Sequence, residues 1–138
     1  MIISLERIND ACHLVATNGD GNVIHIDGAP SVGGENGGFR PMQLMAAGVG
    51  SCSSIDIINI LKKQRQELKD LKVEIKAERE VDKVPSLFKS IHLHYTLSGK
   101  LDNKKVEKAI KLSLEKYCSV IKILEKTSKI SYSFNIEN

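Results

Sequence analysis

The stretch Phe39–Ile58, FRPMQLMAAGVGSCSSIDII, decides how the chain folds. Proline suits the first turn of a helix, and Pro41 opens a run without charged residues that extends to Ile55. The apolar residues of this run predict a helix from Pro41 to about Gln66, with a charged exit from Lys62 onward. We expect the buried positions of this helix to include Leu44, Ala47, Gly48, Ile55, Ile58 and Leu61.

The composition is that of a soluble globular protein. Hydrophobic residues make up 41% of the 138 residues and charged residues 27%, which excludes disordered and collagen-like chains. The length suits one compact domain, so we expect residues 1–138 to form a single domain. The uncharged run is shorter than the roughly 18 to 20 apolar residues of a membrane span, and Met1–Arg7 shows no export signal. We therefore expect a cytoplasmic protein without a membrane partner.

Short strands and a glycine-rich loop precede the predicted helix. Apolar-rich segments predict strands at Ile2–Ile8, Cys12–Thr17 and Val23–Asp27, and Asn18–Gly21 is typical of a hairpin turn. The loop Ala29–Phe39 could cradle a phosphate ahead of the helix. It has neither the P-loop lysine nor the GxGxxG spacing, so the pattern does not favour phosphate binding.

After the helix, apolar and charged side chains alternate, which predicts half-buried strands. One strand covers Leu71–Ala77 and a second covers Leu87–Leu97. A helix over Lys104–Tyr117, a short helical segment over Val120–Lys126 and a last strand over Ile130–Ile136 follow. The order βββ-α-ββ-α-β predicts an α+β fold in which two long helices cover one face of a mainly antiparallel sheet.

Basic residues are concentrated near the C-terminus. The formal net charge of the chain is +3, yet residues 100–129 carry nine basic and four acidic side chains, a net charge of +5. Nucleic acid is the partner to consider. However, Lys104, Lys108 and Lys111 recur opposite an apolar stripe, as on a solvated helix face, and the chain has no Trp and 4% aromatic residues. We therefore expect no nucleic-acid partner.

Three cysteines cannot all pair within one chain, and their odd number fits a reduced setting. Cys52 lies among small residues of the long helix, and Cys118 follows the second helix. From the residues alone, core packing, metal binding and nucleophilic chemistry all stay open for a thiol. A nucleophilic Cys52 would need a nearby cation such as an arginine to stabilise its thiolate. Cys12 fits a place in the core.

Other polar residues could contribute to a site. Asp56, one helical turn after Cys52, could orient the thiol, although a carboxylate beside a thiol disfavours its ionisation. A hydrogen bond within the fold is the simpler interpretation of Asp56. His92 and His94 share one face of a strand and could be two metal ligands, but no third ligand is spaced nearby. We interpret them as exposed strand residues and expect no metal site.

The segment Phe39–Ile58 resembles the signature helix of the OsmC/Ohr family, the osmotically inducible and organic-hydroperoxide-resistance proteins. The likeness lies in the proline, the apolar and small residues, and then the cysteine. A second cysteine 66 positions later, in the sequence YCSV around Cys118, matches the family's other cysteine. The order of elements agrees as well, so the resemblance spans nearly the whole chain. It implies an intertwined homodimer with two active sites at the subunit interface.

The resemblance also implies a two-cysteine peroxidase in oxidative-stress defence, without a bound cofactor. Cys52 as a thiolate would attack an organic hydroperoxide and become a sulfenic acid. Cys118 would condense with the sulfenic acid to form a disulfide, and a dithiol reductant of the lipoyl or thioredoxin type would reduce the pair again.

The sequence differs from these peroxidases where they carry an acidic residue, ten positions before the first cysteine. There the acidic residue holds an arginine near the thiolate, whereas this chain has Met42, followed by Gln43. Arg40 stands just before the proline, and Arg40 paired with Glu35 is a possible substitute. The alternative function is a non-catalytic dimer of the same fold that binds a small apolar ligand at the subunit interface.

Overall fold

Three short strands form the N-terminal sheet. β1 (Ser4–Arg7), β2 (Leu14–Thr17) and β3 (Val23–Ile26) pair antiparallel in that order. The predicted hairpin connects β2 and β3, with Gly21 at a φ of 84°. Glycine adopts this left-handed conformation without strain, so the turn closes where the sequence places it.

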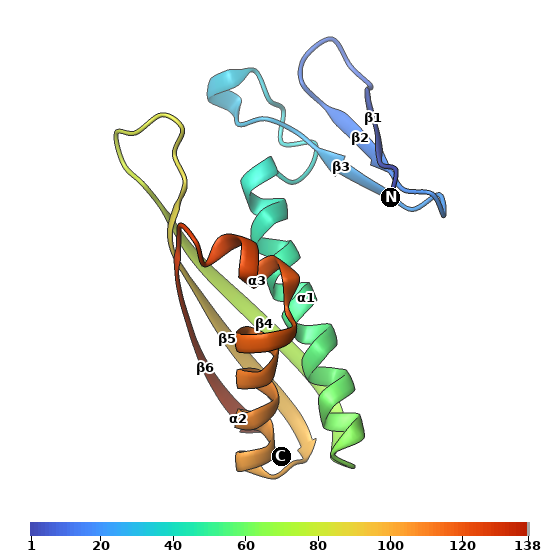
Figure 1. Ribbon diagram of the computed structural model, residues 1–138. Coiled ribbons are helices and arrows are strands. Elements are labelled where there is room, and N and C mark those ends of the chain that lie inside the picture. The colour runs from blue at the N-terminus through green and yellow to red at the C-terminus, as the bar shows by residue number, and fades with distance from the viewer. Residues whose placement is uncertain (138) are drawn as a thin grey trace. The chain divides into compact units, whose positions relative to one another are not determined.

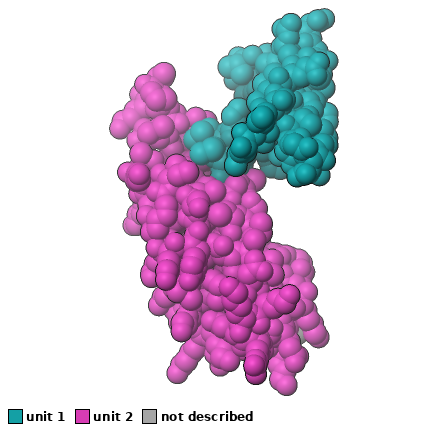
Figure 2. Space-filling view, turned by 45° about the vertical axis from the view of Figure 1, so that its right-hand side comes forward, with its two compact units in different colours: residues 1–45 teal, residues 46–138 magenta. Residues whose placement is uncertain are grey.

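The computed structural model describes residues 1–137 and divides into two compact units, Met1–Met45 and Ala46–Asn138 (Figure 2). The first unit contains the N-terminal sheet, the short helix η1 (Pro30–Val32) and the first residues of α1 (Pro41–Lys63). The second unit contains the rest of α1 and all later elements.

The second unit is built on a sheet of β4 (Glu67–Arg79), β5 (Phe88–Lys100) and β6 (Lys129–Glu137). β4 and β5 pair antiparallel, as a mainly antiparallel sheet requires, whereas β5 and β6 pair parallel. A parallel pair needs a crossover connection, and the helical segments between β5 and β6 supply it. The predicted α+β class is confirmed, with two three-stranded sheets in place of one.

Three helical segments make the crossover: α2 (Asn103–Leu112), the π-helical turn η2 (Ser113–Tyr117) and α3 (Ser119–Leu124). Asp102 caps α2, because its carboxylate accepts the N–H of Lys105 at 2.9 Å. With α1, these helices lie on one face of the second sheet (Figure 1). The predicted second helix is therefore interrupted by a π turn before Cys118.

The core of the second unit lies between this sheet face and the helices. Alternate residues of β5 have no exposed surface, and Val106, Ala109 and Ile110 of α2 are equally buried. The buried residues of β5 are Phe88, Ile91, Leu93, Tyr95 and Leu97, and the last four have no exposed surface. Burying an aliphatic side chain of this size stabilises a fold by about 1.5–3 kcal/mol, so this cluster is a main source of stability.

The buried side of α1 differs from the predicted one. Leu61 is buried as expected, but Ile55 is 59% exposed and Ile58 is 43% exposed. The helix turns small residues toward the sheet instead: a Cβ on Gly50 would lie 2.6 Å from Cδ1 of Ile75 in β4. The close approach of α1 to the sheet thus determines which side of the helix is buried. The spacing of apolar residues alone does not reveal this side.

α1 is long and apolar enough to pass a length and composition test for a membrane span. A core helix of a soluble protein passes the same test. Within α1, Val49, Ile57 and Leu61 are fully buried in the fold, and 28% of the apolar window is buried. The helix ends at Lys63, earlier than predicted, because Arg65 takes a left-handed φ of 57°.

Candidate functional site

Two of the three cysteines meet in the second unit. Cys52 is half-buried in the fourth turn of α1, and Cys118 is fully buried between η2 and α3. The two sulfur atoms and a carboxylate oxygen of Asp56 all lie within 4.8 Å of one another. The structure therefore brings together the predicted pair and Asp56, and it places both thiols close enough for joint chemistry.

The π-helical turn η2 positions Cys118. Its N–H donates to the carbonyl of Ser113 at 2.8 Å, a bond over five residues that closes the turn. The backbone of Cys118 is extended, which ends η2 and lets the residue cap α3. Its Sγ accepts the N–H of Ile121 at 3.5 Å. The sequence predicted a break at this place but not the π turn that creates it.

Burial dominates the electrostatics of Cys118. Loss of solvent and, to a smaller extent, the neighbouring Cys52 raise the pKa of the Cys118 thiol to about 11, against the lowering effect of the Ile121 and Val120 N–H groups. Cys118 is thus a protonated thiol at neutral pH. A resolving role for Cys118 therefore requires a group that removes this proton, because the thiolate is the attacking form in disulfide formation.

Two hydrogen-bonded pairs surround the thiols, and the sequence reasoning missed three of their four members. Ser113 donates its hydroxyl to Oδ2 of Asp56 at 2.9 Å, so the hydrogen bond expected for Asp56 is present. Beneath Cys52, the buried Ser53 hydroxyl lies 2.7 Å from the Tyr95 hydroxyl. Burial raises the pKa of Tyr95 to about 12, and Cys118 and Asp56 contribute to the shift, so Tyr95 belongs to the same surroundings. Only tertiary packing reveals these partners.

A hollow of about 600 Å³ opens beside Asp56, between α1 and the segment formed by α2 and η2. Its lining combines two lysines, two amides and three larger side chains with Asp56: Lys63, Lys108, Asn59, Gln64, Ile60, Leu112 and Tyr117. The hollow gives Asp56 access to solvent and to small molecules.

The two other predicted site residues, Arg40 and Glu35, lie in the first unit and are exposed. Their assignment to the Cys52 site stays a prediction. The four ion pairs found within residues 1–137 do not include a pair between them. Gln43, at the position after Met42, accepts the backbone N–H of Arg40 at 3.0 Å and so caps the start of α1.

Asp27 organises the glycine-rich loop. Its buried carboxylate accepts N–H groups of Gly28, Glu35 and Gly37 at 2.8–3.0 Å. The N–H groups of Glu35 and Gly37 above all lower the pKa of Asp27 to about 2. Amides that could have held a phosphate thus hold the chain's own carboxylate. The half-buried Cys12 also points to Asp27, with its Sγ 3.4 Å from Oδ1.

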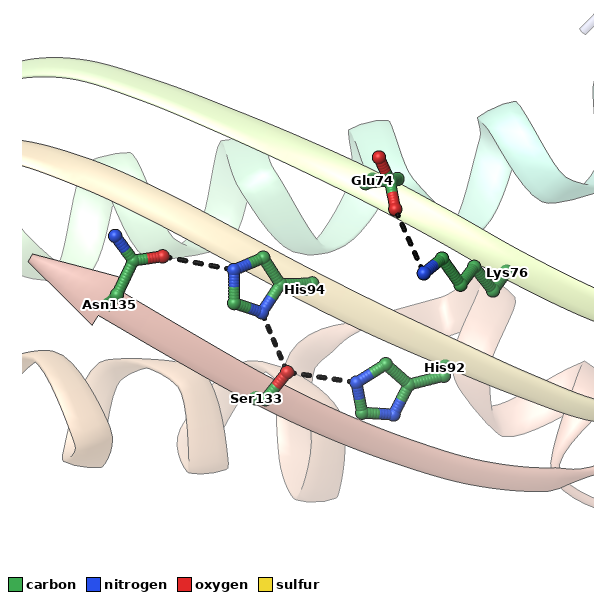
Figure 3. Close-up of polar contacts among 6 residues, drawn as sticks. All are labelled: Glu74, Lys76, His92, His94, Ser133 and Asn135. Carbon is green, nitrogen blue, oxygen red and sulfur yellow. Dashed lines mark hydrogen bonds and ion pairs between the residues drawn. The ribbon is translucent and has the colours of Figure 1, made fainter.

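His92 and His94 lie on the face of the second sheet opposite the helices, in one hydrogen-bonded row (Figure 3). The Ser133 hydroxyl lies 2.8 Å from Nε2 of His92 and 2.7 Å from Nδ1 of His94. The neighbouring Glu74 is paired with Lys76 at 3.4 Å. Ring nitrogens engaged in this way agree with the interpretation of both histidines as strand-surface residues.

Among the described residues, one group of three side chains has donor atoms close enough to share a metal ion, and it is Cys52, Asp56 and Cys118. The histidine row is not part of such a group.

Comparisons with known proteins agree with the geometry. The family described as OsmC-like protein matches residues 34–133. Protein YhfA of Escherichia coli strain K12 is 40% identical over 97 residues, which are 70% of this chain and 72% of YhfA. The crystal structure of a hypothetical protein from Aquifex aeolicus is 36% identical, with a TM-score of 0.81 over 99% of this chain and 97% of that one. The organic hydroperoxide resistance protein OhrB of Bacillus subtilis shares the fold, with a TM-score of 0.64, 23% identity and coverage of 97% and 96%.

Proposed function

Because the chain belongs to the OsmC family, and because its two family cysteines lie within 4.8 Å of each other, we propose that it is a thiol-dependent peroxidase that reduces organic hydroperoxides. The observation that carries the proposal is the proximity of a half-buried Cys52 to a buried, protonated Cys118. Cys52 is accessible to a peroxide, whereas Cys118 is shielded from it and can react with the oxidised Cys52 in a second step.

The cycle consists of two balanced steps. The Cys52 thiolate attacks the peroxide, its sulfur takes the distal oxygen, and the alcohol leaves after gaining a proton; Cys52 is then a sulfenic acid. Cys118 next attacks the sulfenic sulfur, which forms the disulfide and releases water. Asp56 lies within 4.8 Å of both sulfurs, so we assign to it the transfer of the Cys118 proton. A dithiol of the lipoyl or thioredoxin type returns the pair to thiols.

The proposal requires a cation near Cys52 because a carboxylate beside a thiol disfavours the thiolate. Met42 occupies the place of the acidic residue that orients this cation in the peroxidases. We propose that Arg40, with Glu35 as its partner, supplies this positive charge.

We also propose a homodimer in the cytoplasm as the working assembly. On α1, Met45 is 41% exposed, Ile55 is 59% exposed and Ile58 is 43% exposed. Burial of these exposed apolar side chains against a second copy of the chain favours a homodimer.

Turnover with a dithiol tests the function. Cumene hydroperoxide should be consumed catalytically in the presence of reduced lipoamide, and Cys52→Ser should abolish consumption. Cys118→Ser should stop the cycle after one turnover, while the matched Cys12→Ser variant should retain the wild-type rate. If wild-type protein consumes no more peroxide than Cys52→Ser, the non-catalytic dimer that binds a small apolar ligand takes the place of the peroxidase.

A further inference from the structure

The donors at the thiol site have the chemistry of a metal centre. Thiolates favour soft or borderline cations such as Zn²⁺, and a carboxylate is a common additional ligand. Cys52 and Asp56 are four residues apart on one side of α1, so a rigid helix presents two of the donors together. Cys118 supplies the third from the end of η2. Three side chains converge, although sequence spacing does not place Cys118 near the other two.

The distances allow coordination after a small adjustment. Zn–S bonds of about 2.3 Å and Zn–O bonds of about 2.0–2.2 Å place tetrahedral donors about 3.3–3.8 Å apart. The three donor atoms of the site lie within 4.8 Å of one another, so an approach of at most about 1.5 Å closes the set around an ion. Rotation of the half-buried Cys52 side chain and of the Asp56 carboxylate can supply this movement.

A second layer of hydrogen bonds already orients two of the donors. Ser113 donates to Oδ2 of Asp56 at 2.9 Å, which leaves the other carboxylate oxygen for a cation. The Ile121 N–H points at Sγ of Cys118 at 3.5 Å, where it would stabilise a thiolate ligand. Metal ligands are usually held by such partners. The hollow beside Asp56 offers an entry path and room for a fourth, non-protein ligand.

We propose that Cys52, Cys118 and Asp56 bind one Zn²⁺ or a similarly thiophilic divalent cation per chain, with the fourth position open to water or a small anion. Binding displaces the two thiol protons and engages both sulfurs. The metal-bound state and the disulfide therefore exclude each other. The inference does not rest on the proposed peroxidase, since it needs only the reduced thiols.

The test is a zinc titration of the full chain, which is first reduced and then freed of metal and reductant. A chromophoric chelator competes with the protein for Zn²⁺ and reports the affinity. We expect one Zn²⁺ per chain. Cys118→Ser and Cys52→Ser should each weaken binding by at least about 100-fold, beyond the 10- to 100-fold typical of losing a group that only orients a ligand. Ser113→Ala, which removes such a group, should weaken binding by about 10-fold. Cobalt(II) should give thiolate charge-transfer absorption that both cysteine variants lose.

Two controls separate this site from other metal-binding residues of the chain. Cys12→Ser and the double variant His92→Gln/His94→Gln should bind Zn²⁺ as tightly as the wild type. Zinc should also slow alkylation of Cys52 and Cys118 while Cys12 in the same molecules reacts at its usual rate.

The proposal is overturned if no Zn²⁺ binds at micromolar concentrations, if Cys118→Ser retains wild-type affinity, or if the histidine variant loses it. Circular dichroism of each variant establishes that it is folded, and Cys118→Ala gives a second test of the same ligand. No peroxide enters the experiment, so its result is independent of the outcome of the turnover assay.

Discussion

At the scale of single residues, the account depends on a thiol that the fold keeps protonated. The family resemblance pairs Cys52 with Cys118, and the structure brings their sulfurs within 4.8 Å. Asp56 forms the hydrogen bond that the sequence predicts, but its partner Ser113 is 57 positions away. No local pattern encodes such a contact, because it depends on how α1 and η2 pack together.

The raised pKa of Cys118 predicts a pH-dependent stability. In an unfolded chain a thiol has a pKa of about 8.5, whereas burial in the folded chain raises the pKa of Cys118 to about 11. The folded state therefore binds the extra proton between these values, and the free energy of unfolding should fall as the pH rises through this window. Urea unfolding of wild type and Cys118→Ser measures the effect: the variant should show the shallower fall. Equal slopes would contradict the assignment.

The buried pair of Ser53 and Tyr95 predicts an asymmetry between two substitutions. Ser53 donates to the carbonyl of Gly50, so Tyr95 is the donor in the 2.7 Å contact between the hydroxyls. Ser53→Ala leaves the Tyr95 hydroxyl buried without an acceptor and should cost about 1–3 kcal/mol. Tyr95→Phe removes that hydroxyl, so the double variant should lose less stability than the sum of the single ones. If denaturant unfolding shows that the two single losses of stability add up to the loss of the double variant, the hydrogen bond between Ser53 and Tyr95 is contradicted.

At the scale of elements, the sequence predicted the order and type of the segments more reliably than their contacts. The helix beginning at Pro41 and the alternating strands β4 and β5 carry strong local signals, and both formed. The parallel pairing of β6 and the π turn η2 have no such signal, because long-range packing sets strand direction and helix breaks. The buried side of α1 is not predictable from the spacing of large apolar residues, because small residues of the helix face the sheet.

Two glycines of α1 provide a matched test of that packing. A Cβ on Gly50 would meet Ile75 at 2.6 Å, whereas one on Gly48 would meet nothing within 4 Å. Gly50→Ala should therefore destabilise the fold by about 1–3 kcal/mol through overpacking. Gly48→Ala should stabilise the helix by up to about 1 kcal/mol because alanine has the higher helix propensity. Thermal unfolding of both variants measures the contrast, and a Gly50→Ala protein as stable as Gly48→Ala would refute close packing of α1 on β4.

At the scale of the whole molecule, the exposed apolar residues of α1 predict association. Sedimentation equilibrium should give twice the mass of one chain. Replacing both Ile55 and Ile58 by Asp should yield single chains, because charged side chains are costly to bury at an interface. Val81→Asp, in the exposed loop after β4, serves as the control and should leave the dimer intact. A wild-type protein that sediments as one chain would contradict the proposed assembly.

The dimer and the thiol site form one account, in which Cys52 is oxidised and Cys118 resolves it. In the proposed cycle, Arg40 and Glu35 act in the first step, whereas the second step uses the two sulfurs and the Asp56 carboxylate, which the structure brings together. The identity of the bridge is therefore the most direct consequence of the geometry.

The central measurement is the mapping of disulfides after reduced protein meets one equivalent of cumene hydroperoxide. Free thiols are counted with time, and peptides are analysed by mass spectrometry, with Cys52→Ser as the control. The account predicts rapid loss of two thiols, a bridge between Cys52 and Cys118, and a free Cys12. Survival of all three thiols for many minutes, or a bridge that includes Cys12, would contradict it.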